Sequence, residues 1–401
     1  MSLEDNRTAV AQAVEAGLLS GAVTCVWHRG EVIQVNEIGH SDVGANLPMR
    51  RDTIFRIASM TKPVTVAAAM AMAEEGKLAL TDPVSRWLPE LADMRVLTDP
   101  HGPLDDTVAA RRPITIEDLM THRSGLGYAF SVGGEIGRAY GQVSLRQDQD
   151  HWLSEVAMLP LIHQPGERLT YSHGTEVLGI ALSRIEGKPL HVLLTERIFE
   201  PLGMADTGFF ISPDKRGRAA TMYRLDEAGV LQHDMMGPIA VKEPRFAQGG
   251  AGLVSTADDY LRFARMLLAG GTLDGVRVLA EQSVASMRTD RLTDEQKSQP
   301  FLGAPFWLGR GFGLNLSVVT DAARSAQLFG AGGLGTFGWP GAYGTWWQAD
   351  PANDLILIYL IQNYPDLNAA AAAAVAGNTA AAKLQSAQPK FVRRTYEALG
   401  L

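Results

Sequence analysis

The spacing of apolar positions changes along the chain, and these changes predict its elements. Residues 5–17 have helical spacing. The following run, GAVTCVWHRGEVIQVNEIG, predicts two strands joined by a tight turn at His28, Arg29 and Gly30. Strand patterns return late in the chain, in GFGLNLSVV, AYGTWWQAD and NDLILIYLIQ, and DPAND predicts a hairpin turn between the last two. The chain therefore begins and ends with sheet-forming segments.

Helical patterns dominate between these segments. We predict helices at 60–76, 115–122, 172–187, 189–199 and 257–269. The last is followed by two glycines, the residue type that most easily adopts the left-handed conformation at a helix end.

This order predicts an α/β protein of the α+β type, with an antiparallel sheet flanked by helices and a second, all-helical domain. We expect residues 1–58 and 241–401 to form the sheet domain and residues 59–240 the mainly helical one. An active site is expected at the junction, because clefts between domains commonly bind ligands.

Composition narrows the classes of function. The 401 residues are 46% hydrophobic and 20% charged, as in soluble globular proteins, and the net charge of −8 disfavours nucleic acid as a partner. The single cysteine, Cys25, lies in an apolar run and is expected to be a buried core residue. No secretory signal and no membrane-spanning stretch is recognisable, so a cytoplasmic location is expected. We interpret the alanine run at 369–376 as part of a C-terminal helix.

Candidate chemistry begins at FRIASMTKPVTVAAAMAMAEEGKL, which places Ser59 and Lys62 three positions apart where a helix starts. Such residues share one helix face, and backbone N–H groups and the positive dipole end lie nearby. Ser59 is therefore either an ordinary N-cap or a nucleophile beside a base. A second Ser-x-x-Lys match, at Ser212 and Lys215, lies in a polar loop and is expected to have no catalytic role.

Two further segments favour the catalytic interpretation. Tyr171 stands just before a predicted helix, followed by Ser172 and His173. A glycine-rich turn at 338–344 lies between strand patterns, where backbone can approach a ligand closely. Each segment alone would be unremarkable.

In this order, SMTK, YSH and WPG resemble the motifs of the serine β-lactamase and penicillin-binding-protein superfamily, and the resemblance is closest to the class C-like family VIII carboxylesterases. Connecting stretches such as ITIEDLMTHRSGL and IFEPLGMADTGF are similar as well, so the resemblance covers about residues 15 to 365. It implies a β-lactamase-like fold.

The resemblance implies that Ser59 is the acylated nucleophile, Lys62 its hydrogen-bond partner and Tyr171 a second basic group. Isolated lysine and tyrosine side chains have a pKa of about 10, and either can become a base when desolvation and a neighbouring charge change that value. Which of the two takes the serine proton stays open. The backbone N–H groups of Ser59 and Ala342 are implied to hold the oxyanion.

Three departures from the family motifs bear on the substrate. Trp339 replaces a lysine that would face a substrate carboxylate, so we expect Trp339 and Gly341 to line a site for neutral substrates. Pro340 has no N–H to donate. His173 replaces an asparagine, and its imidazole either takes over the task of that amide or points away.

Other chemistries are disfavoured. The sequence has no Gly-x-Ser-x-Gly elbow, no His-Glu-x-x-His or Cys/His metal cluster and no phosphate-binding glycine loop. The sequence therefore predicts a serine carboxylesterase that acts on small neutral esters with no cofactor and no metal. A β-lactamase or D,D-peptidase, an acyltransferase to an alcohol, and a family member that only binds ligands are the alternatives. The oligomeric state cannot be predicted.

Overall fold

A central antiparallel sheet organises the molecule in a computed structural model, which describes residues 2–226, 228–234, 236–364 and 379–401. Within these residues eight strands form the sheet, in the order β12-β13-β14-β15-β16-β1-β2-β3. Their bounds are β12 Arg310–Phe312, β13 Ser317–Val319, β14 Phe337–Gly338, β15 Trp346–Asp350, β16 Leu355–Ile361, β1 Gly21–His28, β2 Glu31–Asp42 and β3 Leu47–Pro48. The first and last strand-forming segments of the chain thus meet at the centre of the sheet, where β16 pairs with β1.

Successive residues of β1 and β16 are buried on opposite faces of the sheet, because side chains alternate along a strand. Ala22 and Val26 pack under the terminal helices α1 (Leu3–Glu15) and α14 (Thr379–Leu399). Val23 and Cys25 lie on the other face, in the main core. Cys25 is fully buried, and this burial raises its pKa to about 12, so it is the core residue that the sequence predicted.

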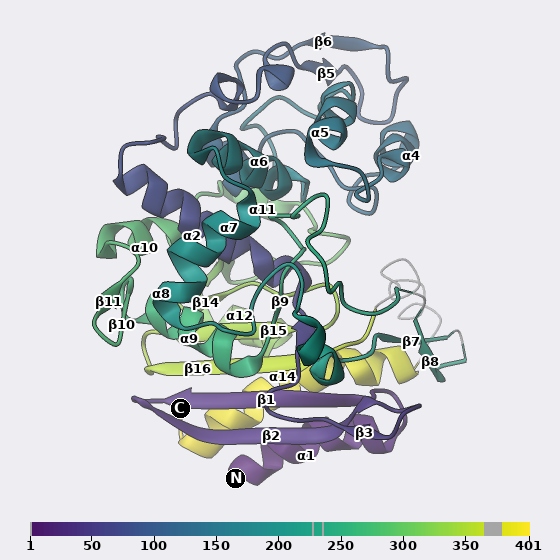
Figure 1. Cartoon of the computed structure of the whole chain (residues 1–401), viewed down its shortest axis with the longest axis vertical. Coiled ribbons are helices and arrows are strands. Elements are labelled where there is room, and N and C mark those ends of the chain that lie inside the picture. The colour runs from purple at the N-terminus through teal and green to yellow at the C-terminus, as the bar shows by residue number, and fades with distance from the viewer. Residues whose placement is uncertain (1, 227, 235, 365–378) are drawn as a thin grey trace.

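Helices of the middle segments cover the second face and extend away from it, with α4, α5 and the β5–β6 hairpin at the far end of the molecule (Figure 1). Their bounds are α2 Thr61–Glu74, α3 Ile116–Met120, α4 Gly134–Gln142, α5 Gln149–Ala157, α6 Gly174–Glu186, α7 Leu190–Leu194, α8 Glu200–Leu202, α9 Ala257–Leu268, α10 Glu281–Met287 and α11 Asp294–Ser298. α12 (Ala322–Phe329) lies on the first face with α14, where Phe329 stacks on Trp346. A π-helical turn, Thr195–Phe199, joins α7 to α8. α2 and α6 are buried over most of their length, which explains their apolar sequences.

Short strand pairs complete the fold. They are β4 (Phe55–Arg56) with β9 (Val254–Ser255), β5 (Arg95–Leu97) with β6 (Thr107–Ala109), β7 (Tyr223–Leu225) with β8 (Leu231–His233), and β10 (Thr272–Leu273) with β11 (Val276–Arg277). The β4–β9 pair joins the chain before Ser59 to the chain before α9.

Most of the predicted elements are present, and the predicted fold class is confirmed. One strand pattern was misread: GFGLNLSVV contains two strands, because Gly313 donates to Leu316 and Asn315 adopts a left-handed φ of 54°, which makes a turn. The alanine run at 369–376 lies outside the described residues. Among those described, no helix has the length and apolar character needed to cross a bilayer. The domain boundaries and the cytoplasmic location stay predictions.

Candidate active site

Ser59 lies in a 3-10 turn, Ala58–Met60, that runs directly into α2. Ala58 has a φ of 46°, a left-handed conformation that costs a non-glycine residue roughly 1–3 kcal/mol and that the surrounding structure must hold in place. The turn is anchored at Ile57, whose N–H donates to Leu253 of the chain next to β9. Ser59 remains partly exposed while both its neighbours are buried. The serine is therefore presented to solvent by a rigid, strained turn.

Lys62 lies one helical turn further on and is completely buried. Its Nζ donates to Ser59 Oγ at 3.4 Å, to the Tyr128 hydroxyl at 3.2 Å and to the Gly250 carbonyl oxygen at 2.8 Å. The predicted contact between serine and lysine is present in the structure. Ser212, in contrast, lies exposed beside a short 3-10 helix, far along the chain from any of these partners.

Tyr171 faces the same lysine. Lys62 Nζ lies 4.8 Å from the centre of the Tyr171 ring, within the range of a cation–π contact. The Tyr171 hydroxyl accepts a hydrogen bond from Trp339 Nε1 at 3.2 Å. The structure thus brings Lys62, Tyr171 and Trp339 together from three separate parts of the chain.

Trp339 does not have the substrate-lining role that the sequence suggested. Only 1% of its surface is exposed, because Phe301, Phe306 and Phe312 pack around it with ring centroids 4.9–5.7 Å away. Its N–H is already used by Tyr171. Its direct effect is on this tyrosine.

The turn after β14 packs against the turn that holds Ser59. A Cβ on Gly341 would collide with the Ile57 carbonyl oxygen and the Thr345 side chain, so only glycine fits this close approach. The Gly341 N–H donates to the Thr345 carbonyl oxygen at 2.8 Å and is not free for a ligand. In the part of the chain that the structure describes, the N–H groups of Ser59 and Ala342 make no hydrogen bond to protein. Both stay available as oxyanion donors.

His173 is the N-cap residue of α6 and is almost completely buried. Its ring packs against Tyr128 and Trp152, with centroid distances of 4.1 and 5.2 Å. Its Nδ1 has no hydrogen-bond partner among the described residues. Burial, helped by the positive charge of Lys62, lowers the pKa of His173 to about 3, so the imidazole is neutral near pH 7. It therefore does not replace the hydrogen bonds of an asparagine amide.

Two residues that the sequence analysis missed complete the buried centre. The Tyr128 hydroxyl donates to both carboxylate oxygens of Glu176, at 2.9 and 3.0 Å, while it accepts from Lys62. Glu176 lies in the first turn of α6 and is 1% exposed. The sequence offered one clue, the position of Glu176 on an otherwise apolar helix face. Charged residues are rarely buried without a partner, so this position indicates a buried polar contact.

His122, which the sequence analysis also missed, packs against Tyr171. It is buried with a left-handed φ of 54°, and its ring lies 4.6 Å from that of Tyr171 in an edge-on contact. Its Nδ1 accepts from the Ser172 N–H at 3.3 Å. Burial lowers the pKa of His122 well below its ordinary value, so the ring is neutral.

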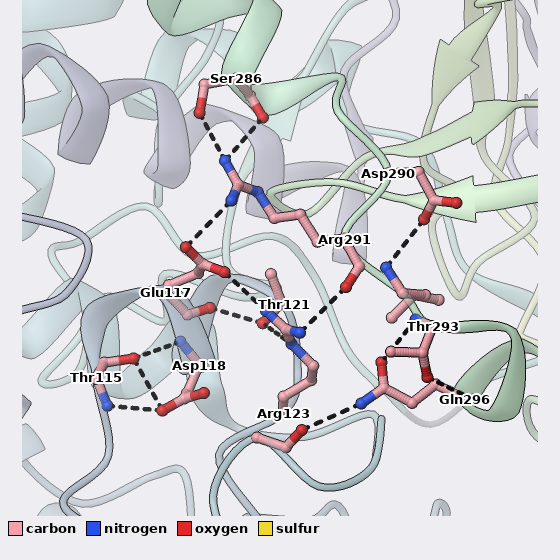
Figure 2. Close-up of polar contacts among 12 residues, drawn as sticks. Thr115, Glu117, Asp118, Thr121, Arg123, Ser286, Asp290, Arg291, Thr293 and Gln296 are labelled. Atoms are coloured by element: carbon pink, nitrogen blue, oxygen red, sulfur yellow. Dashed lines mark hydrogen bonds and ion pairs between the residues drawn. The ribbon is translucent and has the colours of Figure 1, made fainter.

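A polar network fixes the segment that carries His122 (Figure 2). Glu117 of α3 accepts from Arg123 at 2.7 Å and from Arg291 at 3.1 Å, and Arg291 also donates to Ser286 Oγ at 2.7 Å. Arg123 in turn donates to the Arg291 carbonyl oxygen at 3.1 Å. The network ties α3 and the chain after it to the segment between α10 and α11.

Comparison with known proteins identifies the family. A family model described as Beta-lactamase matches residues 6–381.

The chain belongs to the beta-lactamase family. Within it, the chain is 65% identical over 401 residues, the full length of both chains, to Uncharacterized protein MT1414 of Mycobacterium tuberculosis. It is 34% identical over 369 residues to Esterase EstB of Burkholderia gladioli, covering 87% of each chain. The solved structure titled EstCE1, a hydrolase with promiscuous acyltransferase activity, matches with a TM-score of 0.78 and 28% identity, over 97% of this chain and 98% of that one.

These beta-lactamase-family matches confirm the resemblance found in the sequence, the fold class and the general class of enzyme, a serine hydrolase. The roles of the individual site residues stay predictions.

Proposed function

We propose that this protein is a serine carboxylesterase that hydrolyses short-chain neutral esters through an acyl-enzyme on Ser59. The observation that carries the proposal is the 3.4 Å contact between the hydroxyl of the partly exposed Ser59 and Nζ of the buried Lys62. The backbone N–H groups of Ser59 and Ala342 make no hydrogen bond within the described residues. The esterase relative EstB and the hydrolase EstCE1 agree with this chemistry.

In the proposed reaction Ser59 Oγ attacks the ester carbonyl carbon while Tyr171 or Lys62 takes up the serine proton. The N–H groups of Ser59 and Ala342 hold the negative oxygen of the tetrahedral intermediate, a donor pair of the kind that typically contributes about 10²–10³ in kcat per donor. The same proton passes to the leaving alcohol. Water then attacks the acyl-enzyme in the reverse sequence and releases the acid.

Neutral substrates are favoured by what surrounds the site. A cluster of buried aromatic and apolar side chains packs around Tyr171, namely Tyr128, Leu292, Phe301, Trp307, Phe312 and Trp339. The position where a lysine would meet a substrate carboxylate holds the neutral Trp339. A carboxylate-bearing β-lactam lacks its usual counter-charge there, a loss of about 1.5–3 kcal/mol if the missing contact is one charge-assisted hydrogen bond.

The test compares Ser59→Ala with Ser212→Ala. The wild-type protein should hydrolyse short-chain nitrophenyl esters faster than a chromogenic cephalosporin, and intact mass should show one acyl group or one fluorophosphonate bound per chain. Ser59→Ala should lose turnover and labelling, whereas Ser212→Ala should keep both. Stoichiometric labelling that persists in Ser59→Ala would refute the assignment of the nucleophile.

Acyl transfer to an alcohol is a second candidate, because the structural relative EstCE1 is described as having promiscuous acyltransferase activity. Adding an alcohol acceptor to the same assay separates the two reactions. Formation of the new ester faster than the free acid would make transfer the main activity.

A further inference from the structure

A buried chain of polar groups leads from the candidate nucleophile into the core. It runs from Ser59 to Lys62, from Lys62 to Tyr128, and from Tyr128 to both oxygens of Glu176, with successive distances of 3.4, 3.2 and 2.9–3.0 Å. Lys62 and Glu176 are at most 1% exposed. A lone ammonium at such a depth would be strongly destabilised, so an opposite charge is needed nearby.

The hydrogen bonds indicate which protons are present. Lys62 Nζ donates to the Gly250 carbonyl oxygen and to the Tyr128 hydroxyl, and its third partner is the Ser59 hydroxyl, which can donate or accept. The single proton of Tyr128 is directed at Glu176, and burial raises the pKa of Tyr128 well above its ordinary value, so this proton stays on the phenol. Both Glu176 oxygens lie within hydrogen-bond distance of this proton and can accept it.

We propose that Glu176, acting through the Tyr128 hydroxyl, is the counterion of Lys62 and sets the pH range in which the Ser59 site reacts. Glu176 and Tyr128 are positioning residues in this role, because Glu176 reaches Ser59 only through two intervening side chains. In this arrangement Lys62 is an ammonium paired with Glu176 and has no lone pair for the serine proton, so the proton acceptor is Tyr171.

Among the described residues that contact Lys62 and Tyr128, Glu176 is the one carboxylate. From its own helix the neutral His173 approaches, with Nδ1 4.0 Å from Glu176 Oε1. The Tyr171 ring lies 4.8 Å from Lys62 Nζ, and the neutral His122 ring packs edge-on against Tyr171. Gly250, whose carbonyl accepts from Lys62, lies so close that a Cβ there would collide with the Glu176 carboxylate. Burial raises the pKa of Glu176, and the Lys62 charge and the Tyr128 donor oppose that rise.

Loss of the Glu176 charge should shift the pH profile of kcat/KM in one direction, if the chain has the proposed esterase function. A nearby negative charge makes the Lys62 and Tyr171 pair hold its protons more tightly. Removing this charge lets each proton leave at a lower pH. Both limbs of the profile of kcat/KM against pH should therefore move to lower pH when Glu176 is neutralised.

The experiment measures this profile for a nitrophenyl ester in wild type and three variants, with fluorophosphonate labelling of Ser59 followed by intact mass. Glu176→Gln should move both limbs to lower pH by about one to three pH units, the size of the effect of a nearby opposite charge on a pKa. Tyr128→Phe should move them in the same direction, because the buried carboxylate loses its phenolic donor and takes up a proton. Glu176→Asp keeps the charge and should largely restore the wild-type profile.

Glu186→Gln is the matched control, since Glu186 lies at the other end of α6 and pairs with Lys77 and Arg197. Its profile should match wild type. An unchanged profile in folded Glu176→Gln would overturn the inference, and if that variant does not fold, an unchanged profile in Tyr128→Phe would do so. Failure of the proposed function looks different, because wild type would then show no ester turnover and no labelling at Ser59.

Discussion

At the scale of single residues, Trp339 acts on the chemistry through a tyrosine. The indole is buried among phenylalanines and donates its one N–H to Tyr171. This hydrogen bond holds the Tyr171 ring in one orientation. Replacing a lysine by tryptophan therefore removes a substrate contact and adds support for the proposed acid–base group.

This arrangement predicts a measurable coupling between the two residues. Tyr171→Phe should lower kcat by about 10²–10⁴, the usual size of general acid–base assistance. Trp339→Phe should lower kcat by about 2- to 10-fold, the size of one neutral hydrogen bond, and should have almost no further effect in the Tyr171→Phe background. Kinetics of the two single variants and the double variant measure the coupling.

Tyr359→Phe is the control for these substitutions, because Tyr359 is buried on the far face of the sheet and its hydroxyl has no partner within the described residues. Its kcat should equal that of wild type. Additive losses in the double variant would show that Trp339 does not act through Tyr171.

At the scale of elements, the site depends on two turns held against each other. One is the strained turn at Ala58 before α2, and the other is the turn between β14 and β15 that contains Gly341. Thr345 donates its hydroxyl to the Ile57 carbonyl oxygen at 3.3 Å, which joins the two. We expect this contact to hold the Ser59 and Ala342 N–H groups at a fixed separation.

Gly341→Ala should therefore weaken catalysis without removing any reacting group. The added Cβ meets the Ile57 carbonyl oxygen and must push the turn with Ala342 away from Ser59. We expect kcat/KM to fall by about 10²–10³, as when one oxyanion donor is lost, and fluorophosphonate labelling to slow in parallel. Gly217→Ala is the control, since a Cβ there has open space and should change neither rate. Full activity of Gly341→Ala would mean that the Ala342 N–H is not a donor.

At the scale of the whole molecule, the sequence predicted what depends on local pattern. The helices α2, α6 and α9 and the β1–β2 hairpin were predicted from their periodicity, close to their observed bounds. The roles of Tyr128 and Glu176 were not, because their contacts join segments 48 residues apart and depend on how α6 packs beside α2. Short strands such as β5 and β6 were missed as well, since three residues carry too little pattern to recognise.

Burial of histidines across the molecule predicts how its stability depends on pH. Burial lowers the pKa of His122, His163 and His173 in the folded protein, whereas the unfolded chain binds these protons at about pH 6.5. Below that pH the unfolded state binds more protons than the folded state. The contribution of these histidines to stability is therefore present above about pH 6.5 and is lost as the pH falls. For each histidine that stays neutral in the folded protein, the free energy of unfolding falls by up to about 1.4 kcal/mol between pH 7.5 and pH 5.5.

His163 tests this best, because it lies outside the candidate active site and makes two hydrogen bonds as a neutral ring, to the Gln164 carbonyl oxygen and the Thr170 hydroxyl. Urea unfolding at pH 7.5 and 5.5 should show a smaller loss of stability in His163→Gln than in wild type, by up to about 1.4 kcal/mol. His101→Gln, at an exposed histidine, is the control and should lose as much stability as wild type. Equal losses in wild type and His163→Gln would show that His163 becomes protonated in the folded protein, and that its burial does not contribute to acid sensitivity.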